Sequence, residues 1–338
     1  MIERGNGVLN SSKPTTKKTA DVKQSGRAKR VISNKTRRTI LLAVAVVLII
    51  GAISGFAIYR SRMAPFKTTV LEVDGTSINM GYFLKRVAMS GQPSLTTLQA
   101  ITKEEIIKQS VTKPPYDITV TEQEIDQFAR EIARGKNKTI EEGEFNEWYR
   151  QQLNESRLSD AEFRDLLKTR LLSLRMSKYL GDRVPTIAEQ VFVQMFPLKD
   201  YATGNEVKQK LDAGEDFAAL AREYSVDNKL KESGGVVGWI PRGVLDPGFD
   251  NAAFELEIGQ SSEPMYIDKQ IVVVLLISDK AAAREIEEEL LKVIKSKALD
   301  KWLKEEKQYH KVKYRGFKNG YDTETDAWVQ RQLQRMKQ

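Results

Sequence analysis

The chain has 338 residues, enough for two or three domains, and a formal net charge of +8. It has no cysteine, which excludes disulfides and Cys-ligated metals, and its single histidine, His310, excludes a multi-histidine metal site. We therefore expect no metal and no cofactor. Eleven Lys and Arg residues against two acidic residues stand within 1–38, so the basicity belongs to an N-terminal tail and gives no reason to expect a nucleic-acid partner.

The N-terminal region predicts a tail followed by a membrane helix. Residues 1–38 are rich in Ser, Thr, Lys, Asn and Gly, which predicts disorder. The uncharged run 39–59 is about 30 Å long as a helix, the thickness of a bilayer's hydrocarbon core. A cleaved signal peptide is the alternative, but the run is longer than a signal's apolar region and no small-residue cleavage site follows it. The positive-inside rule then places the tail in the cytoplasm and the remainder outside the cell membrane.

The segment 66–186 reads as a short strand pair followed by helices. An alternating strand ends at an Asp74-Gly75 turn, and a helix follows from Asn79. Thr121 with Glu124, and Ser159 with Glu162, have the spacing of capping boxes. The further helices that we expect lie within 95–111, 121–133, 144–153 and 158–180.

A different pattern begins near residue 190. A strand (EQVFVQMFPL) is followed by a helix over 217–224, which Ser225 and Asp227 end, and then by the glycine-rich GGVVGW. A turn around Pro247–Gly248, a second short helix with Phe249 and Phe254, and the buried strand 270–277 complete the pattern.

This second pattern resembles the parvulin-type peptidyl-prolyl isomerases. The blocks GEDFAALAREYS, GGVVGW, PGFDNAAFEL and IGQSSEP stand in that family's order and spacing, and the resemblance covers about 190–279. More loosely, VLEVDG and the helices after it resemble the N-terminal domain of the SurA/PrsA-type foldases. The resemblance implies an α+β fold: a helical SurA-N-like chaperone domain (66–186) with an inserted parvulin-like domain (187–280), a small antiparallel sheet flanked by helices, preceded by one transmembrane helix.

The remaining segment, 281–338, is expected to pack back on the chaperone domain. Residues 281–308 predict a long helix. In the foldases that the chain resembles, a helix from the far end of the chain completes the chaperone domain, and such a return implies that VKYRGF forms a short strand that pairs with VLEVDG. The final stretch, 323–338, predicts a polar amphipathic helix that acts as a surface cap.

The resemblance also implies the site. A proline socket maps onto Leu245 and Phe249, with Val237 and Phe254 nearby, and Ser262 falls close to it. Asp227 takes the place of the Asp or Cys beside the substrate carbonyl. For Phe254 simple core packing, and for Asp227 a turn role, are the alternative interpretations.

The sequence departs from the parvulin pattern at three polar positions. By ungapped comparison, Met195 and Val272 stand where the family has its two histidines, and Val236 stands where it has an Asp. Two hypotheses follow. One is a membrane-anchored isomerase that acts on newly exported, proline-containing polypeptides, and the alternative is a parvulin-like chaperone without isomerase activity. A membrane-tethered adaptor is a third, weaker hypothesis, because the tail has no motif besides its charge.

Overall fold

The computed structural model describes residues 34–267, 271–318 and 320–337. The tail predicted to be disordered therefore lies, up to residue 33, outside the described residues. The chain divides into two compact units, one that ends at Arg62 and one that begins at Met63.

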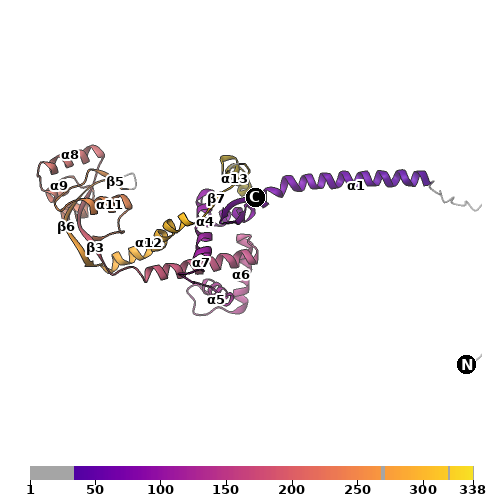
Figure 1. The fold of residues 1–338 in the computed structure, drawn as a ribbon, viewed down its shortest axis with the longest axis horizontal. Coiled ribbons are helices and arrows are strands. Elements are labelled where there is room, and N and C mark those ends of the chain that lie inside the picture. Colours follow the sequence, from indigo (N-terminus) through magenta and orange to yellow (C-terminus); the bar gives the residue numbers. More distant parts are fainter. Residues whose placement is uncertain (1–33, 268–270, 319, 338) are drawn as a thin grey trace, which may run out of the picture. The chain divides into compact units, whose positions relative to one another are not determined.

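The first unit contains one described helix, α1 (Asn34–Arg62), which includes the predicted apolar run (Figure 1). Its large apolar side chains are exposed along its length; Leu41 and Val47, for example, are 67% and 68% accessible. The stretch Leu41–Arg62 has the length and composition of a helix that can cross a membrane.

The second unit begins with a three-stranded antiparallel sheet of order β2-β1-β7. Its strands are β1 (Thr69–Val73), β2 (Thr76–Asn79) and β7 (Val312–Tyr314). The β1–β2 turn is the predicted one, with both Asp74 and Gly75 at positive φ. Leu71 of β1 stands opposite Tyr314 of β7, so the predicted pairing of VLEVDG with VKYRGF is confirmed.

Helices surround this sheet, and their ends are fixed by the expected side chains. The capping boxes of Thr121 with Glu124 and of Ser159 with Glu162 are both present. Asn79 caps the helix after β2 by accepting a hydrogen bond from the Tyr82 N–H at 2.9 Å. The helices are α2 (Ala64–Lys67), α3 (Met80–Ser90), α4 (Ser94–Ser110), α5 (Glu122–Arg134), α6 (Glu142–Ser156) and α7 (Asp160–Gly181).

The C-terminal helices complete the core of this helical part. Trp302 and Leu303 of α12 (Glu288–Glu306) are buried in the same cluster as Phe83 and Leu98. Val329 of α13 (Thr323–Lys337) is fully buried in that cluster too. The last helix is therefore part of the core, and the prediction of a mere surface cap is wrong, since its apolar stripe finds a partner in residues far away in the sequence.

A second, four-stranded antiparallel sheet has the order β4-β3-β6-β5 (Figure 1). Its long central pair, β3 and β6, extends from Ile187 opposite Glu285 to Leu198 opposite Val272, with register shifts between Ala188 and Gln190 and between Phe192 and Val193. The strands are β3 (Ile187–Leu198), β4 (Val236–Pro241), β5 (Met265–Ile267) and β6 (Ile271–Glu285). Since side chains alternate along a strand, each strand contributes to both faces of the sheet.

Helices cover both faces of this sheet. One face packs against α11 (Pro247–Glu255) and the other against α8 (Tyr201–Asp212) and α9 (Phe217–Tyr224). Helix α8 and the short helix α10 (Asn228–Ser233) were not expected from the sequence. Both begin at an aspartate cap: Asp200 accepts a hydrogen bond from the Thr203 N–H, and Asp227 accepts one from the Leu230 N–H, each at 2.8 Å.

Two predicted boundaries are wrong. The stretch 281–285 belongs to β6 and not to the following helix, because these residues pair with the first half of β3. Pro247 and Gly248 form the first turn of α11, where proline's fixed φ suits the helix start, and not a separate turn. The predicted strand at 270–277 begins at Gln270, which lies outside the described residues. The domain boundaries at 186 and 280 stay predictions.

Candidate functional site

The candidate site is the apolar side of the second sheet that α11 covers. We call it the Phe249 face. Its buried members come from β3, β4, β6 and α11, and they are Val191, Val193, Ile240, Phe249, Ala253, Phe254, Val273, Leu275 and Ile277. Seven partly buried apolar side chains pack against them: Met195, Val244, Leu245, Leu256, Met265, Ile267 and Leu290.

Helix α11 aims its aromatic residues at the sheet. Asp246 occupies the N-cap position without a side-chain capping bond, and Pro247 opens the helix. Phe249 and Ala253, four residues apart, therefore share one side. Phe249 is 6% exposed, and its ring therefore forms part of the floor of the face. Leu245 precedes the helix in the loop after β4 and is half-buried. Together with Met195 and Met265 it gives the face a partly accessible apolar edge.

Phe254 is a core residue with its own cover. It is 7% exposed, and the Arg242 guanidinium lies 4.0 Å from the centre of its ring. Its backbone carbonyl accepts a hydrogen bond from the Lys280 ammonium group at 3.1 Å. These contacts match the core-packing interpretation of this residue.

Lys210 and Asp200, two groups near this sheet whose pKa values are shifted, belong to the helices on the side opposite the Phe249 face. The Tyr224 hydroxyl accepts a hydrogen bond from Lys210 at 2.7 Å, which raises the pKa of that lysine, and donates one to Glu206 at 2.7 Å. The pKa of Asp200 is lowered because the carboxylate accepts the Thr203 N–H that starts α8. Both networks hold α8 and α9 in place and stand apart from the Phe249 face.

Comparison with known proteins gives this geometry a context. Residues 199–278 match the family described as Rotamase: PPIC-type PPIASE domain. The chain is 32% identical over 206 residues to the Foldase protein PrsA of Geobacillus kaustophilus, an alignment that covers 58% of this chain and 69% of that relative.

The chain belongs to the PrsA foldase family. It is also 30% identical over 169 residues to the Foldase protein PrsA of Caldanaerobacter subterraneus, and that alignment covers 50% of this chain and 51% of the relative. The chain thus spans about half the length of that relative. Among solved structures, it is similar to the peptidylprolyl isomerase PrsA of Bacillus anthracis, with 19% identity, 71% of this chain and 96% of the other covered, and a TM-score of 0.38.

Within this PrsA-family chain, Met195 and Val272 do not lie together. Met195 packs on the Phe249 face, whereas Val272, 2% exposed, packs on the opposite face against α8 and α9. The two residues therefore lie on opposite faces of the sheet, and of the two only Met195 packs on the Phe249 face. On β6, Val273, Leu275 and Ile277 lie on the same face as Met195; Leu275 stands opposite Met195, and Val273 stands opposite Met265 of β5. Because side chains alternate along a strand, Val272 and Val273 must face opposite sides, but the continuous apolar run does not show which of them faces α11.

Asp227 and Ser262, two polar residues assigned to the site by resemblance, already make hydrogen bonds within the fold, and Val237 lies apart from the Phe249 face. Asp227 caps α10, the turn role given as its alternative interpretation. Ser262 is 5% exposed, and its hydroxyl accepts a hydrogen bond from the Leu275 N–H at 3.1 Å. Val237 is 37% exposed and is not among the residues that pack on the Phe249 face. Which of these residues contacts a substrate stays a prediction.

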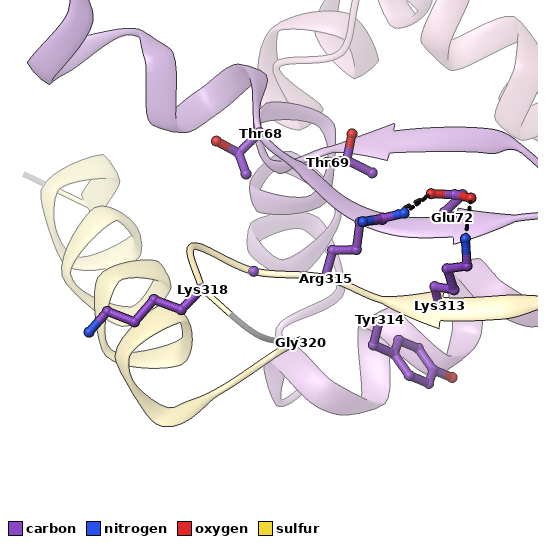
Figure 2. A pocket seen from close by; sticks show the side chains of 9 residues that line it. Thr68, Thr69, Glu72, Lys313, Tyr314, Arg315, Lys318 and Gly320 are labelled. Atoms are coloured by element: carbon purple, nitrogen blue, oxygen red, sulfur yellow. Dashed lines mark hydrogen bonds and ion pairs between the residues drawn. The ribbon is translucent and has the colours of Figure 1, made fainter.

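A large hollow lies elsewhere, in the helical part beside β1 and β7 (Figure 2). Its volume is about 670 Å³, and Glu72 lies between two of its basic side chains. Figure 2 shows Glu72 accepting hydrogen bonds from Arg315 at 2.9 Å and from Lys313 at 3.1 Å. These bonds lower the pKa of Glu72, Arg315 most strongly. Since Glu72 already pairs with both cations, we assign the hollow no ligand.

No metal centre is found in 34–267, 271–318 and 320–337, where no three His, Asp or Glu side chains are arranged to hold an ion.

Proposed function

We propose that this chain is a membrane-anchored foldase that accelerates prolyl cis–trans isomerisation in newly exported polypeptides. The observation that carries the proposal is the Phe249 face, an apolar surface built largely, though not wholly, from the segment 199–278 that matches the PPIC-type domain. Its accessible edge of Met195, Leu245 and Met265 suits a proline ring, which is apolar and compact. The folded helical part of the chain would hold the unfolded polypeptide near this surface.

Prolyl isomerisation is favoured by a dry, apolar binding surface. An X–Pro amide rotates through a twisted state about 18–20 kcal/mol above the planar forms, where resonance between nitrogen and carbonyl is lost. No bond to the enzyme is required. The planar amide is more dipolar than the twisted one, so moving it from water onto a dry apolar surface disfavours the planar forms more.

Side chains of this chain would act by shape and by excluding water. Phe249 provides the floor, and Leu245 and Met195 close over the proline ring. Met195 and Val273 are apolar, so neither adds a proton donor to the face. Asp227 and Ser262 already bond backbone N–H groups. The proposed mechanism therefore needs no nucleophile and no general acid.

The apolar helix α1 supports the proposed membrane anchor. Its described side chains from Leu41 to Tyr59 are exposed, and a row of exposed aliphatic side chains costs free energy in water and gains it in lipid. Eleven Lys and Arg residues precede the apolar run, which favours a cytoplasmic N-terminus and extracytoplasmic folded domains. The partners are then membrane lipid along 39–59 and exported chains outside.

Leu245→Ala tests the isomerase proposal. Because Leu245 is half-buried at the edge of the face, the variant loses an apolar contact worth about 1.4 kcal/mol, which is about a tenfold loss in kcat/KM. The assay is exchange NMR of a proline peptide with the full chain in lipid nanodiscs. Ile258→Ala is the control, since Ile258 is 58% exposed and lies outside the face, and we expect it to keep the wild-type rate.

Absence of acceleration by the wild-type chain would overturn the isomerase proposal. If the peptide still bound and binding still depended on Leu245, the chain would be a peptide-binding chaperone without isomerase activity.

A further inference from the structure

The loop that carries Leu245 is fastened by a buried carboxylate. Asp250, in the first turn of α11, is only 7% exposed. Its Oδ1 accepts a hydrogen bond from the Gly243 N–H at 2.8 Å. Gly243 has φ of +90°, and because glycine adopts positive and negative φ about equally well, its own backbone preference does not fix the loop at this point.

Asp250 has few other partners. The Arg242 guanidinium lies 4.0 Å from Oδ2, and the same guanidinium stacks on the Phe254 ring. Burying a carboxylate is costly unless hydrogen bonds and nearby positive charge compensate. The N-terminal turn of a helix supplies some of that compensation through its dipole. The chain thus retains a buried acid whose one close side-chain hydrogen bond holds the loop 242–246.

A second contact reaches this loop from outside the sheet domain. Lys297 of α12 donates a hydrogen bond to the Val244 carbonyl at 2.7 Å, and Leu290 of α12 packs on the Phe249 face. The backbone is therefore held at residues 243 and 244, directly before Leu245. Lys297 is solvent-exposed and its hydrogen bond is correspondingly weak, whereas that of Asp250 is buried.

We propose that Asp250 is a positioning residue that sets Leu245 at the edge of the Phe249 face, an inference that rests on the proposed isomerase function. Asp250 acts through Leu245 and does not itself contact the substrate. With the Gly243 bond lost, the loop samples several conformations, and a substrate must order Leu245 when it binds. The cost falls on peptide affinity, and so on KM more than on kcat.

The experiment compares three variants of the full chain in nanodiscs. Asp250→Ala removes the acceptor, and Asp250→Asn keeps an oxygen that can accept the Gly243 N–H. Asp246→Ala is the matched control, a carboxylate in the same loop whose side chain makes no capping bond. We expect Asp250→Ala to raise KM about tenfold, Asp250→Asn to restore most of the affinity, and Asp246→Ala to leave it unchanged.

Two further readouts separate positioning from simple stability. In a Leu245→Ala background, Asp250→Ala should add no further loss, because the residue through which it acts is gone. The NMR order parameter of the Leu245 methyl groups should fall in Asp250→Ala and recover in Asp250→Asn.

These readouts also distinguish the two failures. A wild-type chain without isomerase activity would overturn the proposed function, while the Leu245 order parameter would still report on the loop. Unchanged Leu245 methyl groups in a folded Asp250→Ala chain, or additive losses in the double variant, would overturn the positioning role.

Discussion

Val272 and Val273 are adjacent in β6, are almost equally buried, and point to opposite faces of the sheet, which makes them a matched pair. They are 2% and 1% exposed. Val273→Ala and Val272→Ala should each lower the free energy of unfolding by about 2 kcal/mol, the transfer of two methyl groups plus a small cavity. Only Val273→Ala loosens the Phe249 face, so only this variant should lower kcat/KM, by several-fold.

Chemical denaturation and the peptide exchange assay measure the two effects side by side. Equal losses of kcat/KM in both folded variants would contradict the assignment of Val273 to the site.

These two valines also show how far the sequence determined the site. The motif blocks predicted that Leu245 and Phe249 lie together, and both pack on the Phe249 face, because their spacing within the second helix and its loop is fixed by local structure. On β6, the ungapped comparison matched Val272 to a family histidine, whereas the neighbouring residue Val273 is the one that packs on the Phe249 face. A shift of one residue moves a strand side chain to the other face, and only the register with β3 and β5 decides which valine faces Phe249.

At the scale of elements, helix α5 offers a test that depends on pH. Glu124 completes the capping box with Thr121 and is also paired with Arg175, and the pKa of Glu124 falls to about 2, chiefly through the Arg175 hydrogen bond. A carboxyl whose folded pKa lies below its ordinary value of 4.5 stabilises the fold above pH 4.5. That contribution is lost as the pH falls from 4.5 toward 2.

Glu124→Gln keeps the cap and removes the charge. We expect the variant to be less stable than wild type at pH 7, and the difference to close between pH 4.5 and 2. Thermal unfolding of both chains across this range measures it. Glu131→Gln, on the same helix, is the control, and a stability difference for Glu124→Gln that does not change with pH would contradict the prediction.

Elements with local signals were predicted well, and those fixed by distant partners were not. The capping boxes and the Asp74-Gly75 turn depend on residues within four positions of each other. The run AAARE, in contrast, has high helix propensity yet extends β6, since Ile187 and Ala188 of β3 pair with Glu285 and Arg284. Tertiary pairing outweighs the propensity there.

At the scale of the whole molecule, the C-terminal part of the chain packs against the first strands of the helical part. Strand β7 pairs with β1, and the second sheet lies between them in the sequence. Their pairing was expected from the resemblance to the foldases, in which the far end of the chain returns to the first domain. The packing of Trp328 against Phe66 and Phe317 was not predicted, because an amphipathic helix does not reveal which surface its apolar stripe will meet.

The proposed topology of the molecule can be tested with single cysteines, because the chain has none of its own. Asn137→Cys lies in the exposed connection between α5 and α6, and Ser11→Cys lies in the basic tail. On intact cells, a membrane-impermeant maleimide should label Asn137→Cys, since the folded domains are proposed to stand outside. Ser11→Cys should react only after the membrane is permeabilised, because the tail is proposed to stay in the cytoplasm.

The wild-type chain is the unlabelled control. Labelling of Ser11→Cys on intact cells would reverse the topology. A mature chain that has lost the apolar run 39–59 together with the tail would replace the anchor by a cleaved signal.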